Sequence, residues 1–241
     1  MQNTWPEHTL FSPLLTSLGW VEHAFYPAGH NPPAASAYAH QRHSPDIILD
    51  HEAIPPKQRD ADGVIALSDR PVAIYTADCL PVLIADERQH HVAAVHAGLK
   101  GALAGVLLTA VSRLIEQGAI PNSLYIAIGP AIGPCCYELG SEVLGEIQRN
   151  PLLHHTPLWQ RKQPVNPDAI RPQAQATRDS VWFDLPALAQ QMLQQLGVPA
   201  TQIDRVPVCT YCTAEANSSY RRNTHFSQGY RQRFSWIRRR D

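Results

Sequence analysis

Four short runs of β-forming, mostly apolar residues follow one another in the first half of the chain, and they constrain its fold more than any other feature. The runs are GVIAL, PVAIYT, LPVLIA and HVAAVH. Turn-forming pairs such as Ser68-Asp69 and Asp86-Glu87 separate them, as is typical of strands joined by tight turns. We therefore expect these runs to be adjacent strands of one sheet.

The periodicity changes from residue 101 onward. Apolar residues recur three and four apart in GALAGVLLTAVSRLIEQG, which predicts an amphipathic helix ending at Gly118. A second helix is predicted in DLPALAQQMLQQLG, where Asp184 is a suitable N-cap and Gly197 lies just past the end. SLYIAIGP, DRVPVCTY and the C-terminal RQRFSWIRRRD predict further strands, the last with a basic tail.

The remaining segments show little periodicity. Residues 27–60 are rich in Pro, Ala and His and predict a loop-rich segment in which DIILD alone suggests a short strand. Residues 150–180 predict a surface excursion within a domain. Strands and helices without regular alternation indicate an α+β fold: a single domain with mixed β-sheets packed together and flanked by helices.

Charge and hydropathy limit the classes of partner. The 241-residue chain carries 20 basic and 21 acidic residues, so no net field would attract nucleic acid or an anionic membrane. No run approaches the ~20 apolar residues of a membrane span. The first residues lack the charged-then-apolar order of a secretory signal. We expect a cytoplasmic protein with neither a nucleic-acid nor a membrane partner.

The cysteines are expected to be free thiols. Five are present, an odd number in a chain too large to need disulfide bonds. Cys209 and Cys212 have the CxxC spacing of half a zinc ribbon or of a redox motif. Because no second CxxC exists, we expect two buried thiols there.

Cys79 and His96 stand at the ends of two predicted strands. A cysteine beside LPVLIA is often a small core residue, but the neighbouring Asp78 is a charge that is rarely buried without a partner. With His43 of AHQRH, the pair would give three Cys and His ligands, the usual set of a catalytic zinc site with an open fourth position. The alternatives are a hydrolase in which Cys79 is the nucleophile and His96 the base, or a structural zinc site in a binding module.

Two further segments carry candidate anion-binding groups. The glycine-rich IGPAIGPCCYELG follows a predicted strand and could bring backbone amides close to a ligand. Arg221 and Arg222 have planar guanidinium groups that suit phosphate, although a salt-bridged surface pair is an equal alternative.

Several stretches together resemble the laccase-domain family: ADG at 61–63, TADCLPVLIAD, VAAVHAGLKG, AIGPAIGPCCYELG and CTYC followed by SSYRR and GYR. Members of this family are described as polyphenol oxidases and as zinc-dependent purine nucleoside phosphorylases that also deaminate adenosine. The resemblance spans roughly residues 41–237. It implies that residues 1–241 form one laccase-like purine nucleoside phosphorylase domain with a shortened N-terminal segment.

The resemblance also implies site residues. Its zinc ligands fall on His43, Cys79 and His96, with copper as the alternative metal. We expect the catalytic groups to be Asp62, Asp78 and Cys136, where either aspartate could transfer a proton. We expect the phosphate-binding groups to be Arg221, Arg222 and Lys100. The family usually has Trp-Arg where this chain has Leu99-Lys100, and no residue matches an N-terminal arginine of its anion site.

The expected activity is phosphorolysis of adenosine, inosine or methylthioadenosine and hydrolytic deamination of adenosine, by a monomer or homodimer that binds nucleoside and phosphate. A zinc ion would lower the pKa of a bound water, which could then displace the exocyclic amine. Because a cation is missing, we expect phosphorolysis to be weaker relative to deamination than in a relative with the longer N-terminal segment. The alternative, polyphenol oxidation by a copper laccase, requires HxH pairs, and this chain has none.

Overall fold

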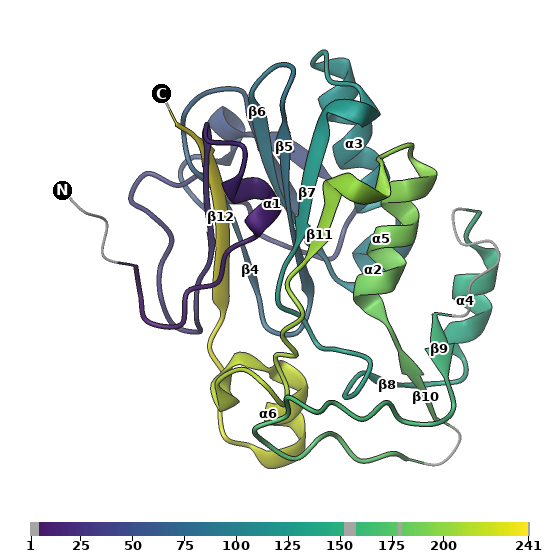
Figure 1. The fold of residues 1–241 in the computed structure, drawn as a ribbon. Helices are drawn as coiled ribbons and strands as arrows, with labels where there is room; N and C mark the ends of the chain where they lie inside the picture. The colour runs from purple at the N-terminus through teal and green to yellow at the C-terminus, as the bar shows by residue number, and fades with distance from the viewer. Residues whose placement is uncertain (1–4, 152–157, 178–179, 241) are drawn as a thin grey trace.

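A six-stranded sheet forms the middle layer of the structure (Figure 1). The computed structural model describes residues 5–151, 158–177 and 180–240. Within these residues, the sheet has the spatial order β11 (Ile203–Arg205), β7 (Leu124–Ile128), β5 (Leu80–Asp86), β6 (His91–Ala97), β3 (Gly63–Ala66), β2 (Ile47–Leu49). The pairs β11–β7 and β2–β3 are parallel, and the others are antiparallel.

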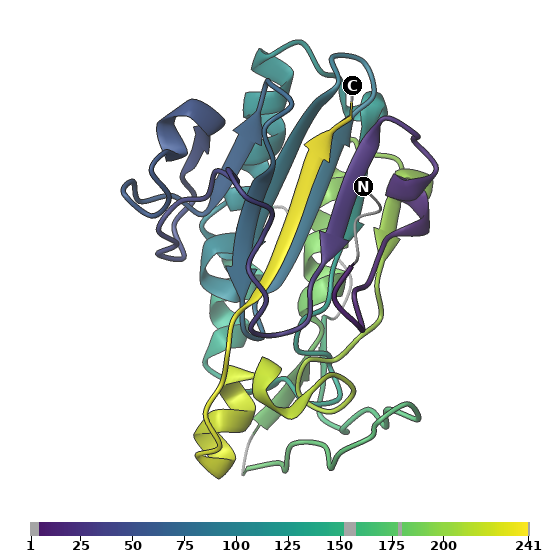
Figure 2. The ribbon, with the colours of Figure 1, turned by 90° about the vertical axis from the view of Figure 1, so that its left-hand side faces the viewer.

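A second, antiparallel sheet covers one face of the first. Its strands are β1 (Val21–Phe25), β12 (Arg233–Arg239) and β4 (Val72–Thr76), with β12 in the middle. Figure 2 shows β12 and β1 side by side in front of the larger sheet, although they come from opposite ends of the chain. Helices α3 (Val106–Glu116) and α5 (Leu185–Gln195) cover the other face, so the layers run sheet, sheet, helix (Figure 1).

The double covering explains why the strand sequences are apolar throughout. All seven residues of β5 are buried. Successive side chains alternate between the two faces: Val82 and Ile84 belong to the core against the helices, whereas Leu83 and Ala85 belong to the core between the sheets. A strand buried on both faces has no polar face to display.

The structure confirms an α+β fold and several sequence-based boundaries. Asp184 caps α5 by accepting a hydrogen bond from the backbone N–H of Ala187 at 2.8 Å. Gly118 and Gly197 follow α3 and α5 with positive φ angles, as helix-terminating glycines do. The predicted helix from residue 101 to 118 is wrong in one respect. It is divided into α2 (Leu99–Leu103) and α3 at Gly105, whose φ of 96° is not helical.

Two strand predictions also need correction. β4 does not join the sheet of β3, β5 and β6, because its edge pairs with β12 from the C-terminus. The strand predicted at DRVPVCTY is reduced to β11, and beyond it the chain makes only an isolated bridge between Cys209 and Ala131.

A smaller lower region extends beyond the ends of these sheets (Figure 1). It contains a third sheet of β8 (Glu138–Gly140), β10 (Ser180–Phe183) and β9 (Trp159–Gln160). Helices α4 (Val143–Arg149) and α6 (Tyr220–Phe226) also lie here. Helix α1 (Pro13–Thr16) packs instead on β1 and β7, and short 3-10 helices occur at Asp50–Ala53, Pro121–Ser123, Ala200–Gln202 and Ala216–Ser218.

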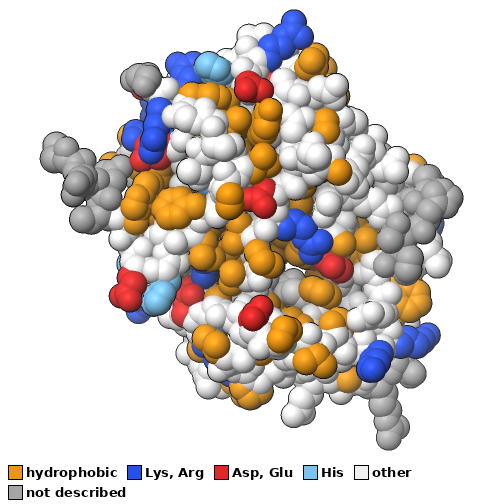
Figure 3. Space-filling model, in the orientation of Figure 1, with side chains coloured by type: hydrophobic (Ala, Val, Ile, Leu, Met, Phe, Trp, Pro, Cys, Tyr) orange, Lys and Arg blue, Asp and Glu red, His pale blue; other side chains and the backbone are white. Residues whose placement is uncertain are grey.

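The surface carries both signs of charge. On the face shown in Figure 3, acidic and basic side chains are scattered, and hydrophobic side chains gather around a hollow near its middle. Among the described residues, no helix is long and apolar enough to cross a membrane.

Candidate metal centre and adjoining cavity

Three potential metal ligands meet at one edge of the central sheet. Cys79 directly precedes β5, and His96 is the penultimate residue of β6, whose register places it opposite Pro81. His43 comes from the loop before β2. The ligand atoms of His43, Cys79 and His96 all lie within 4.8 Å of one another. The antiparallel pairing of β5 and β6 thus brings together the residues that the sequence placed at two strand ends.

Asp62 fixes the orientation of His96. Its Oδ1 lies 2.6 Å from Nδ1 of His96, and its backbone carbonyl accepts the backbone N–H of His96 at 2.7 Å. Because Nδ1 is engaged, Nε2 of the imidazole remains available to a metal. A carboxylate behind a histidine is the usual partner of a metal-binding imidazole.

The same carboxylate organises the loop that carries His43. Backbone N–H groups of Arg42, His43 and Ser44 donate to Asp62 at 2.9, 2.9 and 2.7 Å. His43 has a φ of 60°, a left-handed conformation that lets the loop wrap around the carboxylate. Asp62 is fully buried, so it acts by positioning both histidines rather than by meeting a ligand in the cavity.

Gln41 anchors this loop to the neighbouring sheet. Its side-chain amide donates to the carbonyl of Tyr75 at 2.7 Å and accepts from the N–H of Tyr75 at 2.8 Å. The side chain therefore pairs with β4 as a strand residue would. The sequence analysis did not identify this role, although Gln41 stands two residues before His43 in AHQRH.

The side chains of Cys79, His96 and Asp62 shift one another's pKa values. Burial raises the pKa of Cys79, but hydrogen bonds from His43 and His96 outweigh burial and lower it to about 7. Burial lowers the pKa of His96, but the contacts with Asp62 and Cys79 raise it to about 9. Burial would also raise the pKa of Asp62, whereas hydrogen bonds from His96, Ser44 and Arg42 lower it to about 2. The centre thus favours a thiolate, the form of cysteine that binds a metal.

The donor set fits zinc. One thiolate and two imidazoles are ligands that zinc accepts, and three protein ligands leave the fourth tetrahedral position for water or substrate. Gly98 makes room for this arrangement. A Cβ at this position would lie 2.8 Å from both Sγ of Cys79 and Cδ2 of His43, too close for any side chain.

A cavity of about 620 Å³ opens beside the three ligands. Tyr75, Tyr220 and Tyr230 line it with aromatic rings. Lys57 also lines it, with its ammonium 4.2 Å from the centre of the Tyr75 ring. Thr76 contributes a buried hydroxyl without a hydrogen-bond partner among the described residues. The sequence analysis missed these residues because they come from segments far apart in the chain.

Asp78 is not among the residues that line this cavity, and its carboxylate binds a segment distant in sequence. Its carboxylate accepts hydrogen bonds from Thr210 Oγ1 at 2.6 Å, Ser219 Oγ at 2.9 Å and the backbone N–H of Arg221 at 2.6 Å. Burial raises the pKa of Asp78 despite these bonds. The three donors explain how a carboxylate can be buried beside Cys79, and their hydrogen bonds connect Asp78 to Thr210, Ser219 and Arg221.

The expected phosphate-binding residues do not converge. Arg221 donates to the carbonyl of Glu138 at 2.7 Å, and Arg222 is buried between the rings of Tyr211 and Phe226. Lys100 is exposed on α2. None of Arg221, Arg222 and Lys100 lines the cavity, where Lys57 is the only lysine or arginine among the described residues. The thiol of Cys136 also lies outside the cavity lining, in a separate group of cysteines.

Known proteins similar to this chain agree on family and fold. A family model described as multi-copper polyphenol oxidoreductase laccase matches residues 25–238. The purine nucleoside phosphorylase YfiH of Shigella flexneri is 34% identical over 215 residues, which cover 87% of this chain and 77% of that relative. The protein of the same name from Escherichia coli (strain K12) is 33% identical over 215 residues, with the same shares covered.

Solved structures with low sequence identity have the same fold. The hypothetical protein YfiH of Bacillus licheniformis superposes with a TM-score of 0.73 at 22% identity, covering 93% of this chain and 94% of that chain. YlmD from Geobacillus stearothermophilus superposes with a TM-score of 0.73 at 20% identity, covering 95% of this chain and 94% of that chain.

Proposed function

The chain belongs to the multi-copper polyphenol oxidoreductase laccase family, and we propose that within it this protein is a zinc-dependent enzyme of purine nucleosides. The observation that carries the proposal is the open set of His43, Cys79 and His96 beside a cavity with aromatic walls. The relatives named purine nucleoside phosphorylase support the substrate class. The reactions proposed are phosphorolysis of adenosine, inosine and methylthioadenosine, and hydrolytic deamination of adenosine.

Each part of the site has a task in this proposal. Zinc, when bound, would supply Lewis-acid chemistry at the reacting atom. Asp62 keeps the proton of His96 on Nδ1 and holds the His43 loop against the sheet. The cavity tyrosines offer flat apolar surfaces on which a purine base can stack. The Thr76 hydroxyl, which lacks a partner among the described residues, is available to a polar group of the substrate.

The two reactions make different demands on the cations. Deamination requires a positioned water and proton transfer, whereas phosphorolysis also requires that a phosphate dianion be held against its hydration. We propose Lys57 as the group that meets the anion in the cavity, with Arg221 and Lys100 as candidates outside its lining. Because Lys57 is the only lysine or arginine among the described residues that line the cavity, we expect the site to favour deamination over phosphorolysis.

Product analysis tests the proposal. The zinc-loaded protein is incubated with adenosine, inosine or methylthioadenosine, with and without phosphate, and the products are separated by chromatography. We expect free base and ribose 1-phosphate from adenosine or inosine with phosphate, and inosine and ammonia from adenosine without it.

The Cys79→Ser variant is the control for a contaminating phosphorylase, and it should be inactive in every assay. Absence of turnover of all three nucleosides by the zinc-loaded protein would contradict the proposal. Oxidation of a diphenol by the copper-loaded protein, in the absence of nucleoside turnover, would instead favour a laccase.

A further inference from the structure

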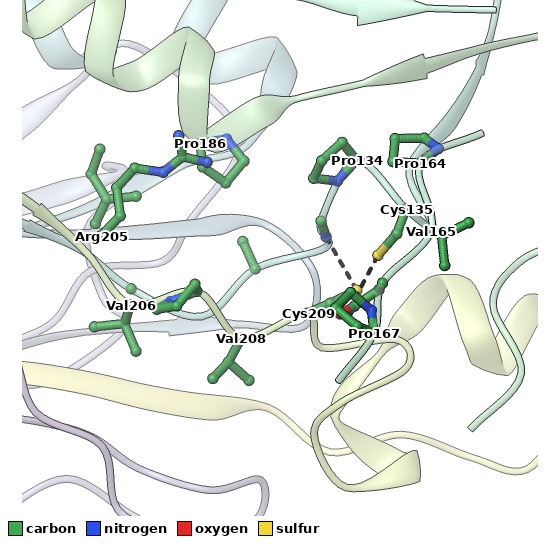
Figure 4. Close-up of a pocket in the computed structure, with 16 residues that line it drawn as sticks. Pro134, Cys135, Pro164, Val165, Pro167, Pro186, Arg205, Val206, Val208 and Cys209 are labelled. Atoms are coloured by element: carbon green, nitrogen blue, oxygen red, sulfur yellow. Dashed lines mark hydrogen bonds between the residues drawn. The ribbon is translucent and has the colours of Figure 1, made fainter. Parts of the chain in front are cut away.

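The other four cysteines form a second group in the lower region. Cys135 and Cys136 lie in the loop after β7, and Cys209 and Cys212 lie in the turn after β11. β7 and β11 are adjacent parallel strands, so the segments that follow them leave the sheet at the same edge. The four sulfur atoms lie within 4.8 Å of one another, and all four residues are buried. Figure 4 shows Cys135 and Cys209 from the two segments with their sulfur atoms directed toward each other.

The sulfur spacing suits a shared ion and not a disulfide. Sγ of Cys135 lies 3.7 Å from Sγ of Cys212. A disulfide requires about 2.05 Å. For a tetrahedral ion with metal–sulfur distances of about 2.3 Å, the edge between two sulfur atoms is about 3.8 Å. The observed separation matches that edge.

Hydrogen-bond donors surround the sulfur atoms. The backbone N–H of Gly133 donates to Sγ of Cys209 at 3.3 Å, and the Asn166 amide lies 3.3 Å from Sγ of Cys212. Nε and Nη2 of Arg171 are buried and have no hydrogen-bond partner in the part of the chain that the structure describes, while its backbone N–H donates to the carbonyl of Cys212 at 3.1 Å. Four thiolates around a divalent cation carry a net charge of −2, and these groups would compensate it.

We propose that Cys135, Cys136, Cys209 and Cys212 bind one zinc ion in a closed, tetrahedral, structural site. Four protein ligands leave no position for water or substrate, which distinguishes structural from catalytic zinc. A compact set of four thiolates selects zinc or iron among the common metals. The four sulfur atoms lie close enough together to bind one ion. The thiol protons leave to solvent when zinc binds.

The lower region has reason to need such a site. Among the described residues, its own apolar core contains eight buried side chains, and four of them are these cysteines. A small core of this kind is commonly stabilised by a metal. The site would also fix Thr210, which stands between the CxxC cysteines and donates to Asp78 next to Cys79. The second ion would therefore hold the segment that supplies Tyr220 to the cavity.

The test uses a protein that lacks the first centre. Purified Cys79→Ser is analysed by elemental mass spectrometry and by X-ray absorption at the zinc edge. We expect about one zinc per chain, surrounded by four sulfur atoms at about 2.3 Å. Zinc with nitrogen or oxygen ligands, iron in place of zinc, or no metal at all would overturn the proposal. So would a mass lower by two hydrogen atoms that locates a disulfide within the group.

A second variant tests the assignment of ligands. Adding Cys212→Ser to Cys79→Ser should remove the remaining zinc, whereas adding Thr213→Ser, next to the ligand, should leave it bound. If the protein with Cys212→Ser does not fold, the absorption spectrum of Cys79→Ser alone still decides the outcome. Zinc retained at full occupancy after Cys212→Ser would show that the cysteines are only buried thiols.

Discussion

The two groups of candidate metal ligands found among the described residues differ in the number of ligands and in their access to solvent. The first has one thiol and two imidazoles, with His43 exposed and a cavity of about 620 Å³ beside it. The second has four thiols, all buried, with its polar neighbours directed at sulfur. Three protein ligands with an open position are typical of a catalytic zinc site, whereas four buried ligands are typical of a structural zinc site.

The comparison also shows how one fold supports both. The first group forms where the start of β5 lies beside the end of the antiparallel strand β6. The second forms in the segments that follow the parallel strands β7 and β11. Asp78 connects them, because it neighbours Cys79 in sequence and holds Thr210 through a hydrogen bond. We therefore expect substitutions in the first group to reduce activity and substitutions in the second to reduce stability.

The largest expected effect is on turnover. Cys79→Ser should reduce nucleoside turnover by about a thousandfold or more, equivalent to about 4 kcal/mol in the barrier. The melting temperature should change little, because Cys79 is not part of the buried cores. Steady-state kinetics and calorimetry measure the two quantities. If Cys79→Ser lost stability as well as activity, the first group would be structural as well as catalytic, and the proposed difference between the two groups would be wrong.

The next effect is on stability. Cys212→Ser should lower the free energy of unfolding by at least about 4 kcal/mol, the range reached when a metal site is lost. For a protein of this size that corresponds to about 10 °C in the melting temperature. Thr213→Ser is the matched control and should melt like the wild type. A shift of only a degree or two in Cys212→Ser would argue against a structural metal.

A smaller effect, on zinc affinity, is expected from substitution of Asp62, the hydrogen-bond partner of His96. Asp62→Asn should weaken zinc binding at the open site about 10- to 100-fold, because the His96 imidazole loses its carboxylate partner. Competition with a coloured chelator measures the affinity. Asp86→Asn is the control, since Asp86 is a buried aspartate at the other end of β5. Equal zinc affinities in both variants would show that Asp62 does not support zinc binding at the open site.

Lys57 should influence phosphate more than nucleoside. Lys57→Ala should raise the KM for phosphate about tenfold, as expected when one charged hydrogen bond of about 1.5 kcal/mol is lost. Lys100→Ala serves as the comparison, because Lys100 is exposed and does not line the cavity. A larger effect from Lys100 than from Lys57 would place the anion on the α2 side of the site.

The smallest effect is a shift in thiol reactivity with pH. After chelation of the open site, alkylation of Cys79 should increase as pH rises through about 7, since its pKa is lowered from the model-compound value of 9.0. Below that pH the thiol is protonated and reacts slowly. Asp62→Asn should move the midpoint upward, because His96 would then hold its proton less firmly. Mass spectrometry of the labelled peptides gives the midpoint, and one near 9 in the wild type would contradict the expected pairing.

Local sequence signals predicted much of the central layer. Strands β3, β5, β6 and β7 and helix α5 were predictable, because apolar runs, caps and turn residues are read over a few positions. The pairing of β4 with β12 was not predictable, because nothing in the local sequence of β4 indicates that its partner strand lies about 160 residues further along the chain.

The site was predictable to a similar degree. His43, Cys79 and His96 follow from their motifs and from the resemblance to a family. The cavity residue Lys57 carries no such motif. The four-thiol group was missed because CC and CxxC are distant in sequence and meet only in the folded chain, where the parallel pairing of β7 and β11 and the bridge between Ala131 and Cys209 bring them together. An adjacent cysteine pair combined with a distant CxxC was the available signal.

Native mass spectrometry during chelation tests the central claim most directly. The purified protein should carry two zinc ions per chain. A mild chelator should remove one ion together with all nucleoside turnover, while circular dichroism stays unchanged. Removal of the second ion should require unfolding conditions. A protein that binds a single zinc, or that releases two ions together with loss of its fold, would contradict the assignment of one open and one closed site.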